Sequence, residues 1–257
     1  MPPSLIKKKF LPDKTTQRTL QLIHNYKKKG LLFQAQPLSF EESIIGLTEN
    51  GIQEIVEKRK ALFKYRSRMK VFLKETEHHH CVTNIRITIE QTFPKLFWVS
   101  DMEMRSGVTR LDKKKFQSLP TFEEKDRFYK NWRPKGKSLF ERTPDGYFEV
   151  IHENYWYPYV LEYENYPYNR DQIFAVLNGL EKNFPKTKKL IVSATMKNGL
   201  RLSDHLLKYA TLPEFRDRRK RPVDISRWYW GVYDQVVSQP FEKAFQPIQP
   251  SQKKTLP

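Results

Sequence analysis

The chain has 257 residues, and its 47 lysines and arginines against 29 aspartates and glutamates give a formal net charge of +18. Solubility needs a net charge of only about 2 to 8 in a small domain, so this excess favours a polyanionic partner, either a nucleic acid or an anionic membrane. A single cysteine excludes an intramolecular disulfide and favours a reducing compartment, and the chain contains no apolar run of about 18 residues that would predict a membrane-spanning helix.

The first 50 residues are predicted to form a basic helical arm. Lys7 to Lys9 and Lys27 to Lys29 bracket its first helix, and Asp13 is the single acidic residue up to position 30. This composition is compatible with a mitochondrial targeting segment and equally with a plain basic arm. No apolar stretch follows the first lysines, so a secretory signal is not expected.

Capping patterns and apolar periodicity predict further helices. Ser39 and Glu42 have capping-box spacing, which predicts a short helix over 39–47. A longer helix is expected over 51–75, where Arg59 and Arg66 interrupt an apolar stripe. The same two signals predict helices over 121–132, 169–184, 199–210 and 224–237.

Alternating apolar residues predict strands between these helices. Ile85, Ile87 and Ile89 would share one face of a strand over 81–91. Helices and strands follow one another without a regular β-α-β order, so we expect an α+β fold: a mostly antiparallel small sheet packed with amphipathic helices, with basic extended termini. Shorter strands are expected over 95–100, 106–111, 146–152, 157–163 and 188–195.

Composition divides the chain into three regions. The basic N-terminal helical arm covers 1–50, and an α+β core covers 51–238. The core has a weak boundary near 112–146, where the sequence is basic and rich in turn residues. The tail over 239–257 is rich in proline and is expected to be extended.

A run of three histidines and the cysteine, His78 to Cys81, raises the question of a metal site. If the run leads into a strand, alternation sends His78 and His80 to one face, and His79 and Cys81 to the other. Structural zinc sites use pairs of Cys or His ligands at short spacing, repeated twice, and no such repeat is present. We therefore expect no bound metal.

Enzyme signatures are also missing from the sequence. It contains no phosphate-binding glycine-rich loop, no dinucleotide fingerprint and no nucleophile elbow. Asp101 and Glu103 would lie on one side of a strand end, which keeps a metal-dependent nuclease as a third alternative. Otherwise we expect no catalytic residue and no cofactor.

Basic residues gather in several separate clusters, which is typical of a chain that contacts phosphate at more than one surface. The predicted nucleic-acid contacts are Lys58, Arg59, Lys60, Lys64, Arg66, Arg68 and Lys70 on the long helix, Lys113, Lys114 and Lys115 in a basic loop, and Arg216, Arg218, Arg219, Lys220 and Arg221 near the C-terminus.

Aromatic residues gather in a different segment, over 155–168. A stacking platform for single-stranded bases would be interleaved with cations, whereas Glu149, Glu153, Glu162 and Glu164 surround these rings. Tyrosine and tryptophan are enriched at protein interfaces. The segment is therefore predicted to contact other proteins, through Tyr155, Trp156, Tyr157 and Tyr159.

Basic surfaces, an aromatic contact segment and tails together favour a non-catalytic structural subunit of a large ribonucleoprotein. The composition is similar to that of lineage-specific mitochondrial ribosomal proteins, which implies RNA, in particular rRNA, and neighbouring protein subunits as partners. Mitochondria are the expected location, with nucleus or cytoplasm as alternatives. The second reading is an accessory subunit of a mitochondrial inner-membrane respiratory complex, in which the charge would meet anionic lipid.

Overall fold

The structure is a computed structural model, and it describes residues 1–35, 44–48, 50–51, 54, 73–105, 107–131, 143–152, 155–165, 167–210 and 223–248. The chain forms two compact units. The first contains Met1–Ile87 and Met102–Lys137, and the second contains Thr88–Asp101 and Ser138–Pro257. Each unit has buried apolar side chains of its own.

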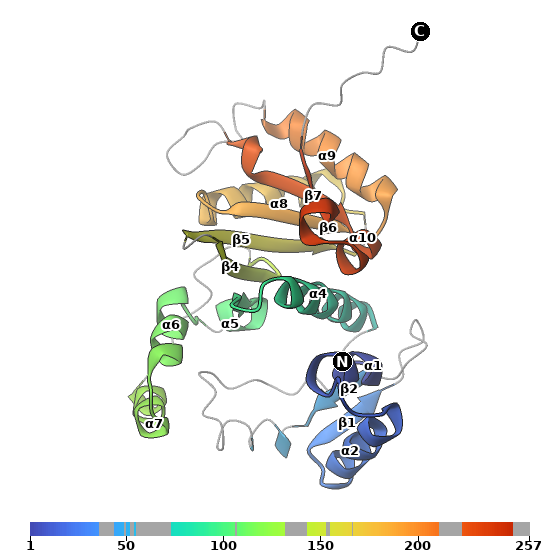
Figure 1. The fold of residues 1–257 in the computed structure, drawn as a ribbon. Helices are drawn as coiled ribbons and strands as arrows, with labels where there is room; N and C mark the ends of the chain where they lie inside the picture. The colour runs from blue at the N-terminus through green and yellow to red at the C-terminus, as the bar shows by residue number, and fades with distance from the viewer. Residues whose placement is uncertain are drawn as a thin grey trace. The chain divides into compact units, whose positions relative to one another are not determined.

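The first unit begins with two helices and a hairpin, drawn in blue in Figure 1. The elements are α1 (Pro3–Phe10), α2 (Thr16–Lys28), β1 (Leu32–Ala35) and β2 (Ile44–Leu47). Helix α1 packs against α2, and the two strands pair antiparallel. Leu5, Thr19, Ile23 and Ile45 are the buried residues of this segment, so one side of each helix faces a small apolar core.

Local hydrogen bonds define both ends of α2. The Thr15 hydroxyl accepts a hydrogen bond from the Arg18 amide and caps the N-terminus. At the C-terminus, Gly30 has a φ of 70°, its amide donates to the Lys27 carbonyl, and the Leu31 amide donates to the Tyr26 carbonyl. These two bonds form a Schellman motif, which requires a left-handed residue at the position of Gly30.

The rest of the first unit is helical in its described part. Helix α4 (Leu73–Thr92) crosses the boundary between the units after Ile87. Three shorter helices follow β3, namely α5 (Asp101–Arg105), α6 (Arg110–Ser118) and α7 (Phe122–Asn131). Reciprocal capping boxes begin α6, through Thr109 and Asp112, and α7, through Thr121 and Glu124.

The second unit is a six-stranded mixed sheet with strands in sequence order, β3-β4-β5-β6-β7-β8. The pairs β5–β6 and β6–β7 are parallel, and the other three pairs are antiparallel. Its elements are β3 (Phe97–Ser100), β4 (Gly146–His152), β5 (Tyr155–Glu164), α8 (Arg170–Asn183), β6 (Lys188–Ser193), α9 (Met196–Ala210), the 3₁₀ turn Ile225–Arg227, β7 (Trp228–Val232), α10 (Tyr233–Ser238), α11 (Phe241–Ala244) and β8 (Gln246–Pro247).

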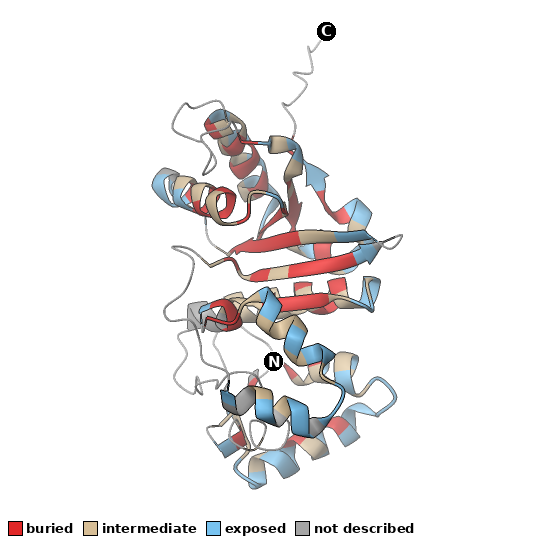
Figure 2. Cartoon of the chain, turned by 90° about the vertical axis from the view of Figure 1, so that its left-hand side faces the viewer, coloured by how far each residue is buried: buried red, intermediate tan, exposed pale blue. Residues whose placement is uncertain are grey.

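The parallel pairs need crossover connections, and α8 and α9 supply them. The two helices contact each other, and α9 packs on β6 and β7. Gly199 of α9 lies so close to Trp230 of β7 that an added Cβ would approach the ring to 2.5 Å. Figure 2 shows buried residues running along the strands, and five of the six residues of the central strand β6 are buried.

Aromatic rings tie the antiparallel half of the sheet together. Trp98 on β3 stacks on Phe148 on β4 with ring centroids 5.3 Å apart, and Phe148 stacks on Tyr159 on β5 at 5.0 Å. These residues are direct partners in the strand registers. Cross-strand aromatic pairs of this kind stabilise a sheet and fix its register.

A buried ion pair joins α8 to the parallel half of the sheet. The Lys189 ammonium on β6 lies 2.9 Å from the Glu181 carboxylate on α8, and their side chains are 0% and 4% exposed. Burial lowers the pKa of Lys189 and raises the pKa of Glu181, while their mutual attraction opposes both shifts. The ammonium also lies 5.6 Å from the ring of Trp228 on β7.

The expected fold class is confirmed. Helices and strands are mixed, and four of the six strand pairs in the described residues are antiparallel. The capping boxes at Thr121 and Asn169 begin helices as predicted. Four of the shorter strands are present as β3, β4, β5 and β6, and the helix predicted over 199–210 is α9. The first residues are helical and not extended. The tail predicted to be extended over 239–257 is described as far as residue 248, where it forms α11 and β8 and buries Ala244, Phe245 and Ile248, and its remaining residues lie outside the described part of the chain.

The strand predicted over 81–91 is wrong, because this segment belongs to α4. Ile85 and Ile89 fit the alternating pattern of a strand, but they are also four residues apart, which is the spacing of one helix face. Cys81 lies four residues before Ile85 and continues the same helical stripe. All three residues are buried. The Thr83 hydroxyl donates to the His79 carbonyl, a bond that β-branched polar residues make within helices.

Three shorter assignments are also corrected. The helix predicted over 224–237 is a 3₁₀ turn capped by Asp224, followed by β7 and α10, because the aromatic run Trp228–Val232 fits a pleated sheet better than a helix. The strand predicted over 106–111 is wrong in its described residues, where a turn leads to Thr109, which caps α6, and α6 begins at Arg110. In 39–47, Ile44–Leu47 is the strand β2 and not a helix, and the residues before it lie outside the described part.

We predict that Lys189→Met lowers the free energy of unfolding by about 3–5 kcal/mol, because it leaves the Glu181 carboxylate buried without its cation. The double change Glu181→Leu with Lys189→Met should recover most of that loss, because both charges are then removed. Urea denaturation followed by circular dichroism measures both effects.

The exposed ion pair of the same unit is the matched control. The Arg227 Nε lies 2.9 Å from the Asp224 carboxylate, and the two side chains are 41% and 48% exposed. Arg227→Gln should therefore lower the free energy of unfolding by less than about 1 kcal/mol. An equally small effect of Lys189→Met would show that the buried pair does not hold α8 on the sheet.

A second stability prediction concerns Gly30. Gly30→Ala should weaken the C-terminus of α2 by about 1–2 kcal/mol, because alanine is strained at a φ of 70°, although no neighbouring atom would meet the added Cβ. Amide hydrogen exchange in α2 should become correspondingly faster. Gly30→Asn is the control, since asparagine tolerates this conformation better, and equal exchange in both variants would contradict the motif.

Candidate nucleic-acid interface

The N-terminal segment combines strong positive charge with almost no acid. Residues 1–35 contain Asp13 as their single acidic residue. Neither α1 nor α2 carries an acidic residue, so no carboxylate on either helix neutralises the cations there. The cations of the segment are Lys7, Lys8, Lys9, Lys14, Arg18, Lys27, Lys28 and Lys29.

Most of these lysines lie at helix C-termini. Lys7 to Lys9 occupy the last turn of α1, and Lys27 and Lys28 occupy the last turn of α2. Cations at this end of a helix complement its dipole and stabilise it by a few tenths of a kcal/mol to about 1 kcal/mol each. Helix stability therefore accounts for part of the lysine content, and the charge alone does not define a site.

The exposed face of α2 is a different kind of feature. Gln17, Gln21, His24 and Lys28 follow one another at intervals of four, three and four residues, so they lie along one stripe of the helix. All four are exposed, and the buried residues Thr19 and Ile23 lie on the opposite side. Arg18 and Asn25 are exposed on the flank of the same stripe.

Hydrogen bonds hold parts of this face in place. The Arg18 guanidinium donates to the Gln21 side-chain oxygen at 2.8 Å, and a hollow of about 410 Å³ is lined by Thr15, Gln17, Arg18 and Gln21. At the other end of α2, the Lys27 ammonium donates to the Gln34 side chain of β1 at 2.5 Å. The face therefore offers amide, guanidinium and imidazole groups on a helix that is fixed to the hairpin.

Fifteen residues are predicted to contact nucleic acid, and the structure describes three of them, Lys113, Lys114 and Lys115. Those on 58–70 and 216–221 lie outside the described residues, and Lys114 is half-buried on α6. The structure therefore brings no predicted cluster together with α2.

Lys113 and Lys115 already have intramolecular partners. Lys113 forms an ion pair with the buried Glu103 carboxylate, and its side chain is 16% exposed. Lys115 lies over the Phe128 ring, 5.6 Å from its centroid. Phosphate would have to compete with these contacts, as it would with the Lys27–Gln34 hydrogen bond of α2.

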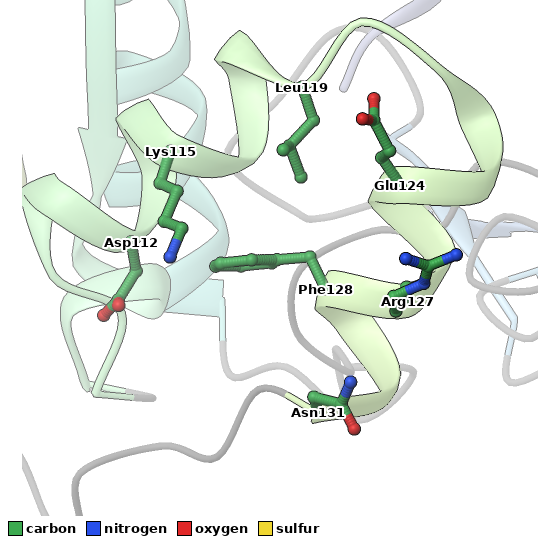
Figure 3. Close-up of a pocket in the computed structure, with 7 residues that line it drawn as sticks. All are labelled: Asp112, Lys115, Leu119, Glu124, Arg127, Phe128 and Asn131. Atoms are coloured by element: carbon green, nitrogen blue, oxygen red, sulfur yellow. The ribbon is translucent and has the colours of Figure 1, made fainter.

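A cavity of about 510 Å³ lies between α6 and α7 (Figure 3). Figure 3 shows the Lys115 and Phe128 side chains directed toward one another across it. Its two acids serve as capping residues, since Asp112 binds Thr109 and Glu124 binds Thr121. The two acids of the lining are thus accounted for by the way the two short helices begin, and Lys115 and Phe128 by their mutual contact.

The aromatic contact segment divides into exposed and buried parts. Tyr155 and Trp156, at the β4–β5 turn, are 69% and 48% exposed. Tyr157 is half-buried, and Tyr159 belongs to the core, where burial is the main cause that raises its pKa to about 12. Only Tyr155 and Trp156 of the predicted set are therefore well placed to meet a partner protein.

The structure corrects the acidic character expected of this segment at three of its four glutamates, and the fourth, Glu153, lies outside the described residues. Glu149, Glu162 and Glu164 are all buried. The Glu164 carboxylate accepts hydrogen bonds from the Ser193 hydroxyl and the Tyr168 amide. These carboxylates are part of the core of the sheet and do not make the surface around Tyr155 negative.

The residues considered for metal chemistry are spread apart. On α4, the run from His78 to Cys81 turns by about 100° per residue, so its members point in different directions. Asp101 and Glu103 lie two residues apart on the short helix α5, not on a strand end, and therefore face different sides. Among the residues that the structure describes, no three His, Cys, Asp or Glu side chains gather as metal ligands would.

Within the same described part of the chain, no helix has the length and apolar composition needed to span a bilayer.

Sequence reasoning recognised the lysines at the end of α1 and at the end of α2 but missed the stripe between them. The signal was available, because Gln17, Gln21, His24 and Lys28 have the spacing of a helical face. Uncharged polar residues were passed over because they are normal on any exposed helix. What distinguishes them is their position between two lysine clusters on an acid-free helix.

Comparison with protein-family models, with curated proteins and with solved structures finds no match to this chain. Any statement about its function therefore rests on its own residues and geometry.

Proposed function

We propose that the chain is a non-catalytic nucleic-acid-binding protein whose α1–α2 segment contacts the phosphate backbone. The observation that carries the proposal is the acid-free, exposed helix α2 with lysines at its end and at the end of α1. Phosphate contacts by lysine and arginine supply most of the affinity for nucleic acids, without regard to sequence.

An anionic membrane would also attract these lysines, but the arrangement of apolar residues argues against it. A helix that lies in a membrane surface needs a continuous apolar face. Leu20 and Tyr26 are exposed on α2 but lie on different sides of it, and Phe10 is exposed at the end of α1. The face that the helix presents between its lysines is polar.

A second candidate function is the structural subunit of a ribonucleoprotein, with rRNA and neighbouring proteins as partners. The exposed pair Tyr155 and Trp156 favours it, because large exposed aromatic residues are typical of protein contacts. This candidate shares the phosphate contacts of α1 and α2 and adds a protein contact on the second unit. A mitochondrial location remains a proposal with it.

We predict that changing Lys27, Lys28 and Lys29 together to Gln reduces the salt dependence of nucleic-acid binding. Each lost phosphate contact should lower the slope of log K against log salt by about 0.7 to 0.9, so the triple variant should lose about 2 to 3 from the slope. Fluorescence anisotropy of the full chain with a labelled duplex, between about 50 and 200 mM salt, measures it.

The control removes the same charge elsewhere. Lys186, Lys197 and Lys208 are not buried and lie on the second unit, and their joint change to Gln should leave the slope within about 0.5 of the wild-type value. Equal loss of slope in both triple variants would mean that net charge, and not the α1–α2 segment, governs binding.

For the protein contact, we predict that Tyr155→Ala with Trp156→Ala lowers recovery of partner proteins at least roughly tenfold, because exposed aromatic anchors often dominate an interface. The measurement is affinity purification of the native assembly through a tag on this chain, with the co-purifying proteins and RNA quantified. Leu200→Ala, at a residue 53% exposed on α9, is the control. Unchanged recovery of partners, or the absence of rRNA from the wild-type assembly, would count against the ribonucleoprotein candidate.

A further inference from the structure

We infer that α2 lies in the major groove of duplex DNA and reads base edges through Gln17, Arg18 and Gln21. This inference rests on the proposed nucleic-acid binding and names its substrate class. The starting point is the order of elements: a helix, a five-residue connection over 11–15, a second helix packed on the first, and a two-stranded hairpin. That is close to the order of a helix-turn-helix, whose connection has three or four residues.

The dimensions of α2 suit this placement. Its 13 residues extend for about 20 Å at 1.5 Å per residue, and a helix with its side chains is about 10–12 Å across. The major groove of B-form DNA is about 12 Å wide and admits one helix. Because only one side of α2 is buried, by Thr19 and Ile23, the other side can enter the groove without unpacking the segment.

The distribution of side chains along α2 matches the two kinds of DNA contact. The amide and guanidinium groups of Gln17, Arg18 and Gln21 lie in its N-terminal half, which is the part of a recognition helix that meets base edges. Arginine binds guanine and glutamine binds adenine in the major groove, each by a pair of hydrogen bonds. Lys27 and Lys28, in the last turn, lie where phosphate contacts would be expected.

The first helix has the complementary role. In a helix-turn-helix, the first helix crosses the phosphate backbone while the second lies in the groove. Lys7 to Lys9 occupy the last turn of α1, directly before the connection to α2. Thus both helices bring lysines to the edges of a groove that α2 would occupy.

An ordinary solvent-exposed helix is the alternative explanation, and two other helices of the chain differ from α2 in their first turn, although α9 also has no acidic residue there. Helix α7, for example, carries Glu123 and Glu124 in its first turn, and α8 carries Asp171. Such acids stabilise a helix N-terminus and would repel DNA. The first turn of α2 has no acidic residue and has Gln17 and Arg18 instead. The helix therefore lacks the stabilisation that an acid would give its N-terminus, and its first turn carries no negative charge that would repel DNA.

DNA is favoured over duplex RNA by the same geometry. The major groove of A-form RNA is deep and narrow, and side chains cannot read base edges there. A helix with Gln17 and Gln21 on one exposed stripe and Arg18 on its flank therefore fits B-form DNA. The prediction is of sequence-selective DNA binding, with RNA duplexes bound only through charge.

The test uses the full chain and a library of duplex DNA with about 20 random base pairs, enough to cover two turns of the groove. Selection should yield a preferred sequence. Gln17→Ala, Gln21→Ala and Arg18→Lys, which keeps the charge but loses the paired hydrogen bonds, should each weaken binding to that sequence roughly 10- to 100-fold. Binding to a scrambled duplex should hardly change.

Two controls make the outcomes distinct. Gln239→Ala, at an exposed glutamine of the second unit, should leave the preference intact, and an RNA duplex of the selected sequence should bind no better than scrambled DNA. Salt-dependent binding without any preferred sequence would overturn base reading and leave the proposed function standing. Equal affinity for the RNA duplex would also overturn it, whereas no binding to any nucleic acid would overturn the proposed function itself.

Discussion

The position of α8 in the second unit is constrained by the burial of one ion pair, Glu181 on α8 with Lys189 on β6. Burying either charge alone would be far more costly than burying the pair. A shift of α8 along the sheet by one turn would separate the two groups and leave an ammonium in the core. The pair therefore selects one position of the crossover helix, and with it the parallel pairing of β5 with β6. The neighbouring indole of Trp228 extends this constraint to β7.

The second unit and the α1–α2 segment differ in their acidic residues. In the second unit, Glu149, Glu162, Glu164 and Glu181 are withdrawn into the core, where hydrogen bonds or an ion pair satisfy those whose contacts are known. Their negative charge contributes little to the surface. In the N-terminal segment there is almost no acid to withdraw. Among the described residues, α1 and α2 therefore present their cations with almost no acid beside them.

Local signals in the sequence located several elements, although the capping-box spacing at Ser39 predicted a helix where Ile44–Leu47 is a strand. The capping boxes at Thr121 and Asn169 begin helices because each involves only four consecutive residues and no distant packing. The strands β4 and β6 were recognisable from short apolar runs between turn residues. By contrast, Ile85 and Ile89 satisfy both the strand period and the helix period, and only the packing of α4 decides between them. The run Trp228–Val232 was assigned to a helix because Trp228, Val232 and Val236 also fit a helical stripe.

The candidate site was less predictable than the fold for a related reason. Lysine clusters are visible in composition, but the face of α2 becomes evident only when the burial of Thr19 and Ile23 fixes which side is outward. The burial of Glu162 and Glu164 was equally hidden, since a carboxylate in a strand is usually assigned to the surface. Charge patterns indicate a class of partner, whereas the packed structure decides which of the charges can reach it.

The uneven distribution of tryptophans makes the intrinsic fluorescence of the two units unequal. Four of the five tryptophans, Trp98, Trp156, Trp228 and Trp230, belong to the second unit, and three of these are buried. The segment with α1 and α2 contains no tryptophan. Intrinsic fluorescence therefore reports mainly on the sheet, and a conformational change confined to α1 and α2 would hardly alter it. A dye or an inserted indole on α1 or α2 would be needed to give that segment a spectroscopic signal of its own.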